Sequence, residues 1–297
     1  MDEEEEDPDE TLADCFTRTQ AVVQIPSLNV LCLMKLVQWV THEEPDDATN
    51  ETKREEEEPN EEQEQHSHQQ ETVQEFLQNL PLPGTVIEDT IAYLAKQDLL
   101  TFKGFSCLIE SAAAKNMKRL RLNGVASSRL NIPKVAKICP DIELLDLTNL
   151  NIPGRVLREA FKQLRSLKSL NLKWCDRLDN IALRIVLENN SPGLEDLNLG
   201  WCTAITDSGL DLVPRCQNLR FLNLSGTCIT FEILREILSN CNRLEFLGVK
   251  NCKNITSLRD INFSGLNLEG VNLTGLSFIP SVELARLIKG RFVFTAA

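Results

Sequence analysis

Histidine is nearly missing from this sequence. Among 297 residues there are three, His42, His66 and His68, so residues 69–297 contain none. That long stretch cannot supply a catalytic triad or a histidine general base. A phosphate-binding GxxxxGK loop and a GxGxxG dinucleotide fingerprint are missing as well. These absences predict a protein that is not an enzyme, uses no cofactor and takes no small-molecule substrate.

Cysteine pairs of the metal-binding type are also missing. None of the ten cysteines forms a CxxC pair, so we predict no metal site. His66 and His68 stand in a stretch rich in Glu and Gln, which favours solvated polar side chains over metal ligands. The sequence starts MDEEEED, without the basic segment and apolar core of a secretory signal. We therefore expect reduced thiols and a location in the cytoplasm, the nucleus or both.

Long apolar runs are scarce, and the acidic residues gather at one end. The best apolar run, residues 25–40, contains Lys35 and Gln38 and is too short to cross a membrane. Residues 1–75 hold 23 acidic and 4 basic side chains, whereas the remainder holds 21 acidic and 27 basic. Such acidic runs predict a disordered tail over 1–24 and a disordered insert over 41–72. An alternative is that the acidic region guards a basic binding surface of the same chain.

What the sequence does contain is an internal repeat. Six segments share the pattern apolar-x-x-apolar-x-apolar, and their first anchors lie 25, 25, 27, 25 and 25 residues apart. The last two anchors of each segment are two residues apart, so on a strand both point to one face. One short strand cannot bury that face alone, so neighbouring strands must stack into a continuous core. The anchors are Met117/Leu120/Leu122, Ile142/Leu145/Leu147, Leu167/Leu170/Leu172, Leu194/Leu197/Leu199, Leu219/Leu222/Leu224 and Leu244/Leu247/Val249.

A second signature follows each predicted strand. Cys175, Cys202 and Cys252 each stand three residues after the last anchor, and Thr227 takes that place in the fifth repeat. Apolar runs with helical spacing come next, so we expect helices on the convex side. A cysteine behaves as a small hydrophobe and suits a buried turn. Three more cysteines are predicted to close these helices: Cys139, Cys216 and Cys241.

The repeats resemble a known family. The strings LKSLNLKWCDRLDN, LEDLNLGWCTAITDSGL and LEFLGVKNCKNIT are similar to cysteine-containing leucine-rich repeats, a type common in substrate receptors of ubiquitin ligases. The resemblance covers about residues 117–256. It implies an α/β leucine-rich-repeat solenoid, shaped like a horseshoe, with six repeats over 117–257 and a helical N-terminal cap.

Residues 258–297 are predicted to form a C-terminal cap. INFSG, LNLEG, VNLTG and LSFIP recur every five residues and resemble a pentapeptide repeat over 258–280. Four such units make only about one coil, so an irregular cap that covers the last repeat is favoured. Residues 281–290 predict a short closing helix with Ser281 as its N-cap.

Two apolar islands flank the acidic insert. Residues 25–40 predict a helix on which Leu28, Cys32 and Leu36 form one stripe. Together with Ser27, this spacing resembles the elongin-binding box, in which Ser/Thr/Pro-Leu is followed at steps of four by Cys and an aliphatic residue. The resemblance implies that these four residues bind the adaptor elongin C. An ordinary amphipathic helix is the alternative.

The second island, residues 73–116, is predicted to be a helical cap with a helix over 85–100. Its residues Leu80, Pro81, Leu82 and Pro83 are similar to the cullin-selecting box that follows the elongin box in suppressor-of-cytokine-signalling proteins. That resemblance implies a cullin contact, although the gap after the first box is longer than in that family. The same island also resembles the first half of an F-box, without its tryptophan-bearing end. A plain cap of the solenoid is the third interpretation.

In leucine-rich repeats the residues between the anchors line the concave sheet. Phe221 and Phe246 are neighbouring apolar groups on a face expected to be wet, which is typical of a binding hot spot. Packing of these rings against residues 258–297 is the alternative. The charges on this face are mixed, so we predict no nucleic-acid partner. The predicted partner-binding residues are Arg119, Arg121, Lys173, Trp174, Asp196, Trp201, Phe221, Phe246 and Lys250.

The leading hypothesis is therefore a non-catalytic substrate-recognition subunit of a cullin-RING E3 ubiquitin ligase. Its N-terminal segment would bind elongin B/C or another cullin adaptor and a cullin, and its repeats would hold the substrate. The contrasting hypotheses are a stand-alone scaffold or inhibitor, and a degenerate F-box protein.

Overall fold

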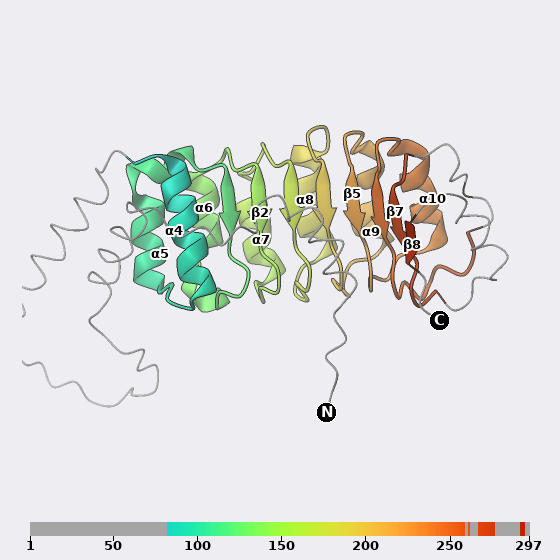
Figure 1. Ribbon diagram of the computed structural model, residues 1–297, viewed down its shortest axis with the longest axis horizontal. Helices are drawn as coiled ribbons and strands as arrows, with labels where there is room; N and C mark the ends of the chain where they lie inside the picture. Colours follow the sequence, from blue (N-terminus) through green and yellow to red (C-terminus); the bar gives the residue numbers. More distant parts are fainter. Residues whose placement is uncertain (1–81, 259–260, 262–266, 277–291, 295–297) are drawn as a thin grey trace, which may run out of the picture.

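The computed structural model describes residues 82–258, 261, 267–276 and 292–294. Four predicted segments lie outside the described residues: the tail (1–24), the elongin-box-like helix (25–40), the acidic insert (41–72) and the closing helix (281–290). The described part of the chain is an elongated array of strands and helices (Figure 1).

The strands form one parallel sheet in chain order (Figure 1). Its register aligns the second anchor of each repeat, so Leu120 pairs with Leu145 and the series continues to Leu247. All six predicted strands are present, and two more follow. The strands are β1 (Arg119–Arg121), β2 (Leu144–Asp146), β3 (Ser169–Asn171), β4 (Asp196–Asn198), β5 (Phe221–Asn223), β6 (Phe246–Gly248), β7 (Gly270–Asn272) and β8 (Phe292–Phe294).

Helices cover one face of this sheet, as the apolar runs after the strands predict (Figure 1). The fourth repeat has a short α-helix because Pro214 starts a separate 3-10 turn soon after it. The helices of the repeats are α6 (Ile132–Ile138), α7 (Gly154–Phe161), α8 (Asn180–Asn190), α9 (Asp207–Leu210) and α10 (Phe231–Asn240). The 3-10 helices are η2 (Ala112–Asn116), η3 (Ser127–Arg129) and η4 (Val213–Arg215).

The core is a continuous row of leucines between the sheet and the helices. In the third repeat Leu167, Leu170 and Leu172 are all at most 1% exposed, and the other repeats follow the same pattern. Burial of a leucine side chain contributes roughly 2 kcal/mol. Since each repeat shares its anchors with the next, stability is spread along the array and depends on stacking.

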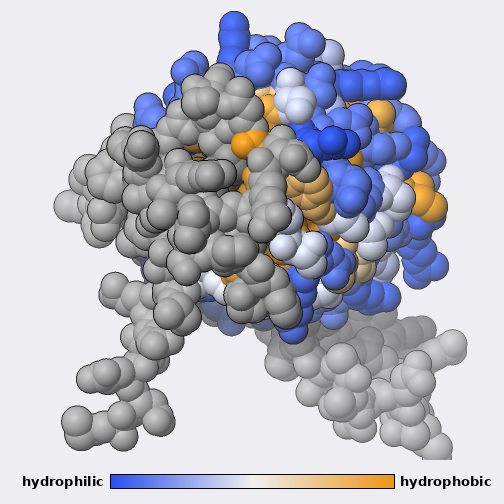
Figure 2. Space-filling view, turned by 90° about the vertical axis from the view of Figure 1, so that its right-hand side faces the viewer, coloured by the Kyte–Doolittle hydropathy of each residue, from blue (hydrophilic) through white to orange (hydrophobic). Residues whose placement is uncertain are grey.

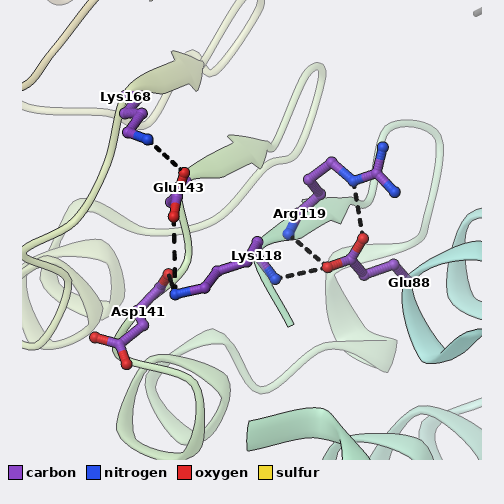
Figure 3. A network of polar contacts seen from close by, with 6 residues as sticks. All are labelled: Glu88, Lys118, Arg119, Asp141, Glu143 and Lys168. Atoms are coloured by element: carbon purple, nitrogen blue, oxygen red, sulfur yellow. Dashed lines mark hydrogen bonds and ion pairs between the residues drawn. The ribbon is translucent and has the colours of Figure 1, made fainter. Parts of the chain in front are cut away.

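The N-terminal end of the sheet is covered by α4 (Gly84–Lys96), which lies beside β1, and by α5 (Phe102–Glu110) (Figure 1). Glu88 of α4 is 6% exposed and accepts the backbone N–H groups of Lys118 and Arg119 at 2.6 and 3.0 Å. It also binds Arg119 Nε at 2.8 Å (Figure 3). The edge strand is therefore capped by a side chain as well as covered by a helix. A helix stands where one is predicted over 85–100, but it ends at Lys96.

The sheet continues beyond the sixth repeat, into the segment predicted as a C-terminal cap. Strand β7 pairs with β6, and β8 pairs with β7. Leu268, Val271 and Leu273 are 3 to 4% exposed and repeat the anchor pattern, 24 residues after Leu244. Much of the pentapeptide-like stretch lies outside the described residues. Within the described part, its central Leu268 and Leu273 act as anchors of another solenoid turn.

Charges alternate along the edge where the strands begin. The residue just before each strand is Lys118, Glu143, Lys168, Glu195, Arg220 and Glu245 in turn. Glu143 lies between two lysines, 3.8 Å from Lys118 Nζ and 2.7 Å from Lys168 Nζ (Figure 3). The hydrogen bond from Lys168 lowers the pKa of Glu143. Opposite charges on adjacent strands favour the aligned register.

Candidate protein-binding surface

The face of the sheet that the helices leave open carries the predicted binding residues, but one of its rows is structural. In five repeats an Asn or Asp at the end of the strand accepts, through Oδ1, the backbone N–H of the residue two further on, at 3.0 to 3.1 Å. These side chains hold the turn that leaves each strand. They are Asp146, Asn171, Asn198, Asn223 and Asn272.

A second row of the open face holds Arg119, Asp196, Phe221 and Phe246. Phe221 and Phe246 are register partners on β5 and β6, as predicted. Phe221 is 8% exposed, so packing within the chain suits it better than an open contact. Burial raises the pKa of the Asp196 carboxyl, and a hydrogen bond from Ser169 acts in the opposite direction. Arg119 is held by Glu88 of the cap.

The turn after each strand contains a residue with a left-handed backbone. The same position has positive φ in seven successive turns, and the occupants are Gly124, Asn149, Trp174, Trp201, Gly226, Asn251 and Gly275. In five of these turns the N–H of that residue donates to a carbonyl of the next turn, at 2.6 to 2.9 Å. The left-handed conformation therefore continues the hydrogen-bond ladder beyond the strands.

Two of these seven positions hold tryptophan instead of glycine or asparagine. Trp174 has φ of 64° and Trp201 has φ of 62°. Glycine adopts this conformation freely and asparagine tolerates it, whereas a bulky side chain costs about 1–3 kcal/mol. Local strain of this kind is often retained at functional positions.

The two tryptophan rings stack on each other, with centroids 5.0 Å apart and planes 3° from parallel. Gly226 of the next turn lies against the Trp201 ring, and a Cβ built at position 226 would be 2.6 Å from that ring. Trp201 is thus packed between Trp174 and a glycine backbone, and its buried Nε1 has no hydrogen-bond partner. Trp174 is the outer ring and is 41% exposed. We call these two rings the tryptophan platform.

The cysteines that follow the platform are structural. Cys175 donates its thiol to the Leu147 carbonyl at 3.1 Å, and Cys202 to the Leu172 carbonyl at 3.0 Å. Each thiol therefore ties its turn to the preceding repeat. Burial raises the pKa of both thiols to about 12. This matches the predicted packing role, and the predicted closing cysteines end α6, η4 and α10.

Sequence reasoning named both tryptophans, and the structure brings them together. Lys173 directly precedes Trp174 in the same turn, whereas Arg121 and Lys250 belong to other repeats. Leu82 packs against the core and Pro83 is the N-cap of α4. Ser27, Leu28, Cys32 and Leu36 lie outside the described residues, as do Leu80 and Pro81.

Among the described residues, most of the surface seen from the C-terminal end of the array is hydrophilic (Figure 2). Four large apolar side chains of the described residues are exposed: Leu99, Phe102, Trp174 and Ile181. Among the described residues, no helix is long and apolar enough to cross a membrane. The same residues contain no group of His, Cys, Asp and Glu suited to a metal ion.

Comparison with known families agrees with this geometry. Residues 190–213 and 215–238 match the family model described as Leucine Rich repeat. Leucine-rich repeats are therefore present, and the parallel sheet with its helices is the α/β fold that such repeats form. Proteins with such repeats are generally non-catalytic scaffolds, and the repeats make this chain a scaffold for protein interaction.

Several solved structures are similar to this chain at low identity. Human 5T4, or trophoblast glycoprotein, is 20% identical over 61% of this chain and 69% of its own, with a TM-score of 0.41. Internalin C2 from Listeria monocytogenes is 19% identical over 73% of this chain and 99% of its own, at 0.39. The Rad7 and Elc1 complex of yeast gives 14% identity over 89% and 85%, at 0.36. Likeness at this level carries no information on function.

Proposed function

We propose that this protein is the substrate-recognition subunit of a cullin-RING E3 ubiquitin ligase. Ser27, Leu28, Cys32 and Leu36 would bind elongin C, and residues 80–83 would contact the cullin. The repeats would hold the substrate. The protein itself would catalyse no reaction, because ubiquitin transfer is the task of the other subunits.

The observation that carries this proposal is the order of two sequence boxes. The Leu28, Cys32 and Leu36 stripe comes first, and the Leu-Pro-Leu-Pro turn follows it directly before α4. Two boxes in the expected order are a stronger signal than either alone. The long acidic insert between them departs from the family pattern.

The attachment of α4 supports the proposal in a second way. Leu82 packs against the core, and Glu88 fixes α4 to β1 through three hydrogen bonds. A cullin bound at residues 80–83 would therefore be joined to the repeats without a flexible hinge. A receptor needs such a fixed direction between its ligase end and its substrate surface.

The exposed apolar side chains at the same end offer further support. Leu99, in the short connection between α4 and α5, is 47% exposed, and Phe102, the first residue of α5, is 52% exposed. Two of the four exposed large apolar groups of the described residues thus belong to the N-terminal cap that carries the proposed ligase attachment, at the other end of α4 from Pro83. Exposed apolar groups next to each other commonly mark a contact with another protein.

Co-purification with elongin B/C tests the proposal. The full chain is co-expressed with elongin B and elongin C, and we expect a stable complex. Leu28→Ala combined with Cys32→Phe should lose it, because the stripe would lack its leading side chain and would clash at its centre. Met34→Ala, on the opposite side of the predicted helix, is the matched control and should still bind. Failure of the wild-type chain to bind, or full binding by the double variant, contradicts the proposal.

The alternative of a stand-alone scaffold or inhibitor needs the repeats alone. It predicts no elongin complex, yet an undiminished ability of the repeats to bind a partner. The degenerate F-box interpretation predicts that a different cullin adaptor replaces elongin C. The same co-expression, repeated with that adaptor, separates these two cases.

A further inference from the structure

The tryptophan platform occupies positions that the fold would fill with glycine or asparagine. Five of the seven left-handed turn positions hold those residues, and only the third and fourth repeats hold tryptophan. Both tryptophans therefore carry backbone strain that the turn itself does not require. Because the two turns are adjacent, the side chains meet as a stacked pair.

The platform is built so that one ring is supported and the other is presented. Trp201 lies on Gly226, where any Cβ would collide with the ring. Trp174 lies on Trp201 and keeps 41% of its surface open. A purely structural ring would be covered from both sides. The arrangement instead displays a flat aromatic surface at the turn edge of the array.

Two carboxylates belong to the part of the array that carries the exposed ring. Asp176 is exposed and stands two residues after Trp174. Cys175, the residue between them, donates its thiol to the carbonyl of Leu147, so the end of β2 with Asp146 lies against this turn. Both carboxylates act electrostatically on Cys175, where they add to the rise in its pKa. Oδ1 of Asp146 is engaged by Thr148.

Cations of this chain occur near the platform too. Lys173 is 8% exposed, whereas Arg177 is exposed at the surface. Neither the carboxylates nor these cations dominate the wider surroundings. The choice of ligand therefore rests on the ring itself and on the carboxylates of Asp146 and Asp176.

We propose that the open face of Trp174 is a stacking site for an arginine side chain of a protein partner, with Asp146 and Asp176 as the acceptors for its guanidinium. A guanidinium is planar, stacks on an indole and donates in a fork that suits carboxylates. A lysine ammonium lacks the planar group, and an apolar side chain lacks the charge. This inference rests on the proposed use of the repeats as the receptor surface, but it does not depend on elongin.

The test uses the full chain with Trp39→Phe, so that Trp174 and Trp201 are the remaining indoles. The probe is N-acetyl-arginine amide, and the lysine and leucine amides serve as comparisons at equal ionic strength. Two-dimensional nitrogen-15 spectra follow the indole N–H signals. We expect the arginine probe to shift the Trp174 signal in a saturable manner, the lysine probe to bind about three times more weakly, and the leucine probe to cause no shift.

Two variants make the test decisive. Trp174→Asn keeps a residue that tolerates the left-handed turn, so it should not lower the melting temperature, and the arginine probe should cause no saturable shift of the one remaining indole signal, that of Trp201. Asp176→Asn should weaken the arginine probe about two- to threefold. Equal responses of the intact platform to arginine and leucine, or a saturable arginine response in Trp174→Asn, would falsify the proposal. A large loss of melting temperature in Trp174→Asn would show that the ring is structural and would also overturn it.

Elongin co-purification of the chain with an intact platform, set beside its response to the arginine probe, separates this inference from the proposed function. If elongin C binds but arginine does not, the arginine site is wrong and the ligase proposal stands. If arginine binds but elongin C does not, the ligase proposal is wrong and the platform remains a site of the scaffold.

Discussion

Single residues in the turns decide how this array presents side chains. The left-handed position after each strand accepts glycine freely, tolerates asparagine, and accepts a tryptophan only with strain. Trp201 depends on a second single residue, because its ring fits only above a glycine at position 226. The platform therefore depends on the absence of a Cβ at position 226.

Gly226→Ala should destabilise the protein more than Gly124→Ala. Both glycines have positive φ, at 68° and 82°, so both variants carry the cost of a left-handed alanine, about 1 kcal/mol. A Cβ at position 124 meets nothing within 4 Å, whereas at position 226 it collides with the Trp201 ring. Thermal unfolding of the two variants should therefore differ, and Gly226→Ala should also quench or shift tryptophan emission. Equal melting temperatures would mean that Trp201 moves aside freely.

The buried thiols should make the protein less stable in alkali. Burial raises the pKa of Cys202 from its usual 9.0 to about 12. In the unfolded chain this thiol loses its proton near pH 9, but in the folded chain the thiol stays protonated at that pH. Above pH 9 the folded state thus holds more protons, and the free energy of unfolding falls as pH rises to about 12, by up to ~1.4 kcal/mol per pH unit for this thiol. Its contribution is fully present below pH 9.

Urea unfolding between pH 8 and pH 11 checks this slope. Cys202→Ala should reduce the slope, while Cys228→Ala, at an exposed position, is the matched control and should leave it unchanged. Parallel pH profiles for wild type and Cys202→Ala would contradict the assignment of the slope to the buried thiol.

At the level of elements, the period of the apolar anchors was enough to predict the strands of all six repeats and the helices after them. It failed for β7, although Leu268, Val271 and Leu273 carry the same pattern. The five-residue period of the surrounding sequence concealed that signal. The apolar pattern also did not predict that α9 is short. A proline within an apolar run shortens the helix but leaves the apolar spacing of the run unchanged.

The capping of β1 was predictable only in part. A helix over 85–100 follows from apolar spacing, but the role of Glu88 depends on tertiary contact with residues 30 and 31 positions away. No local pattern marks a glutamate that will accept two backbone N–H groups. The stacking of the two tryptophans, in contrast, follows directly from their equal position in adjacent repeats.

Glu88→Ala should loosen the N-terminal cap. It would leave the N–H groups of Lys118 and Arg119 without their acceptor, at a cost of about 2–3 kcal/mol. Hydrogen exchange should accelerate at the β1 amides and leave those of β5 unchanged. Asp98→Asn, which removes only an exposed ion pair with Arg129, is the control and should have little effect. Uniform acceleration along all strands would mean that the cap does not unfold separately.

At the level of the whole molecule, the array behaves as a one-dimensional stack. Each strand pairs only with its neighbours in chain order, so a defect in the middle interrupts two interfaces and a defect at the end interrupts one. Functional roles divide along the same axis. The proposed ligase attachment lies at the α4 end, and the platform lies in the third and fourth repeats.

Leu197→Ala and Leu120→Ala should therefore differ, although both leucines are at most 1% exposed. Either truncation costs about 2–5 kcal/mol through lost burial and a cavity. In the middle of the array, Leu197→Ala should separate the unfolding of the two halves, so that calorimetry records two transitions. Leu120→Ala, next to the cap, should retain one main transition at lower temperature. A single sharp transition for both variants would indicate that the array is more cooperative than its topology implies.

Because one backbone conformation recurs in seven turns, the platform could be moved to another repeat by substitution. Because every turn offers the same left-handed position one strand spacing from the next, about 4.8 Å away, Asn149→Trp together with Trp201→Gly would rebuild the pair one repeat closer to the cap. Trp174 would then become the supported ring and the new tryptophan the presented one. The core leucines would be unchanged, so the residues of the turns determine where a binding site lies along this scaffold.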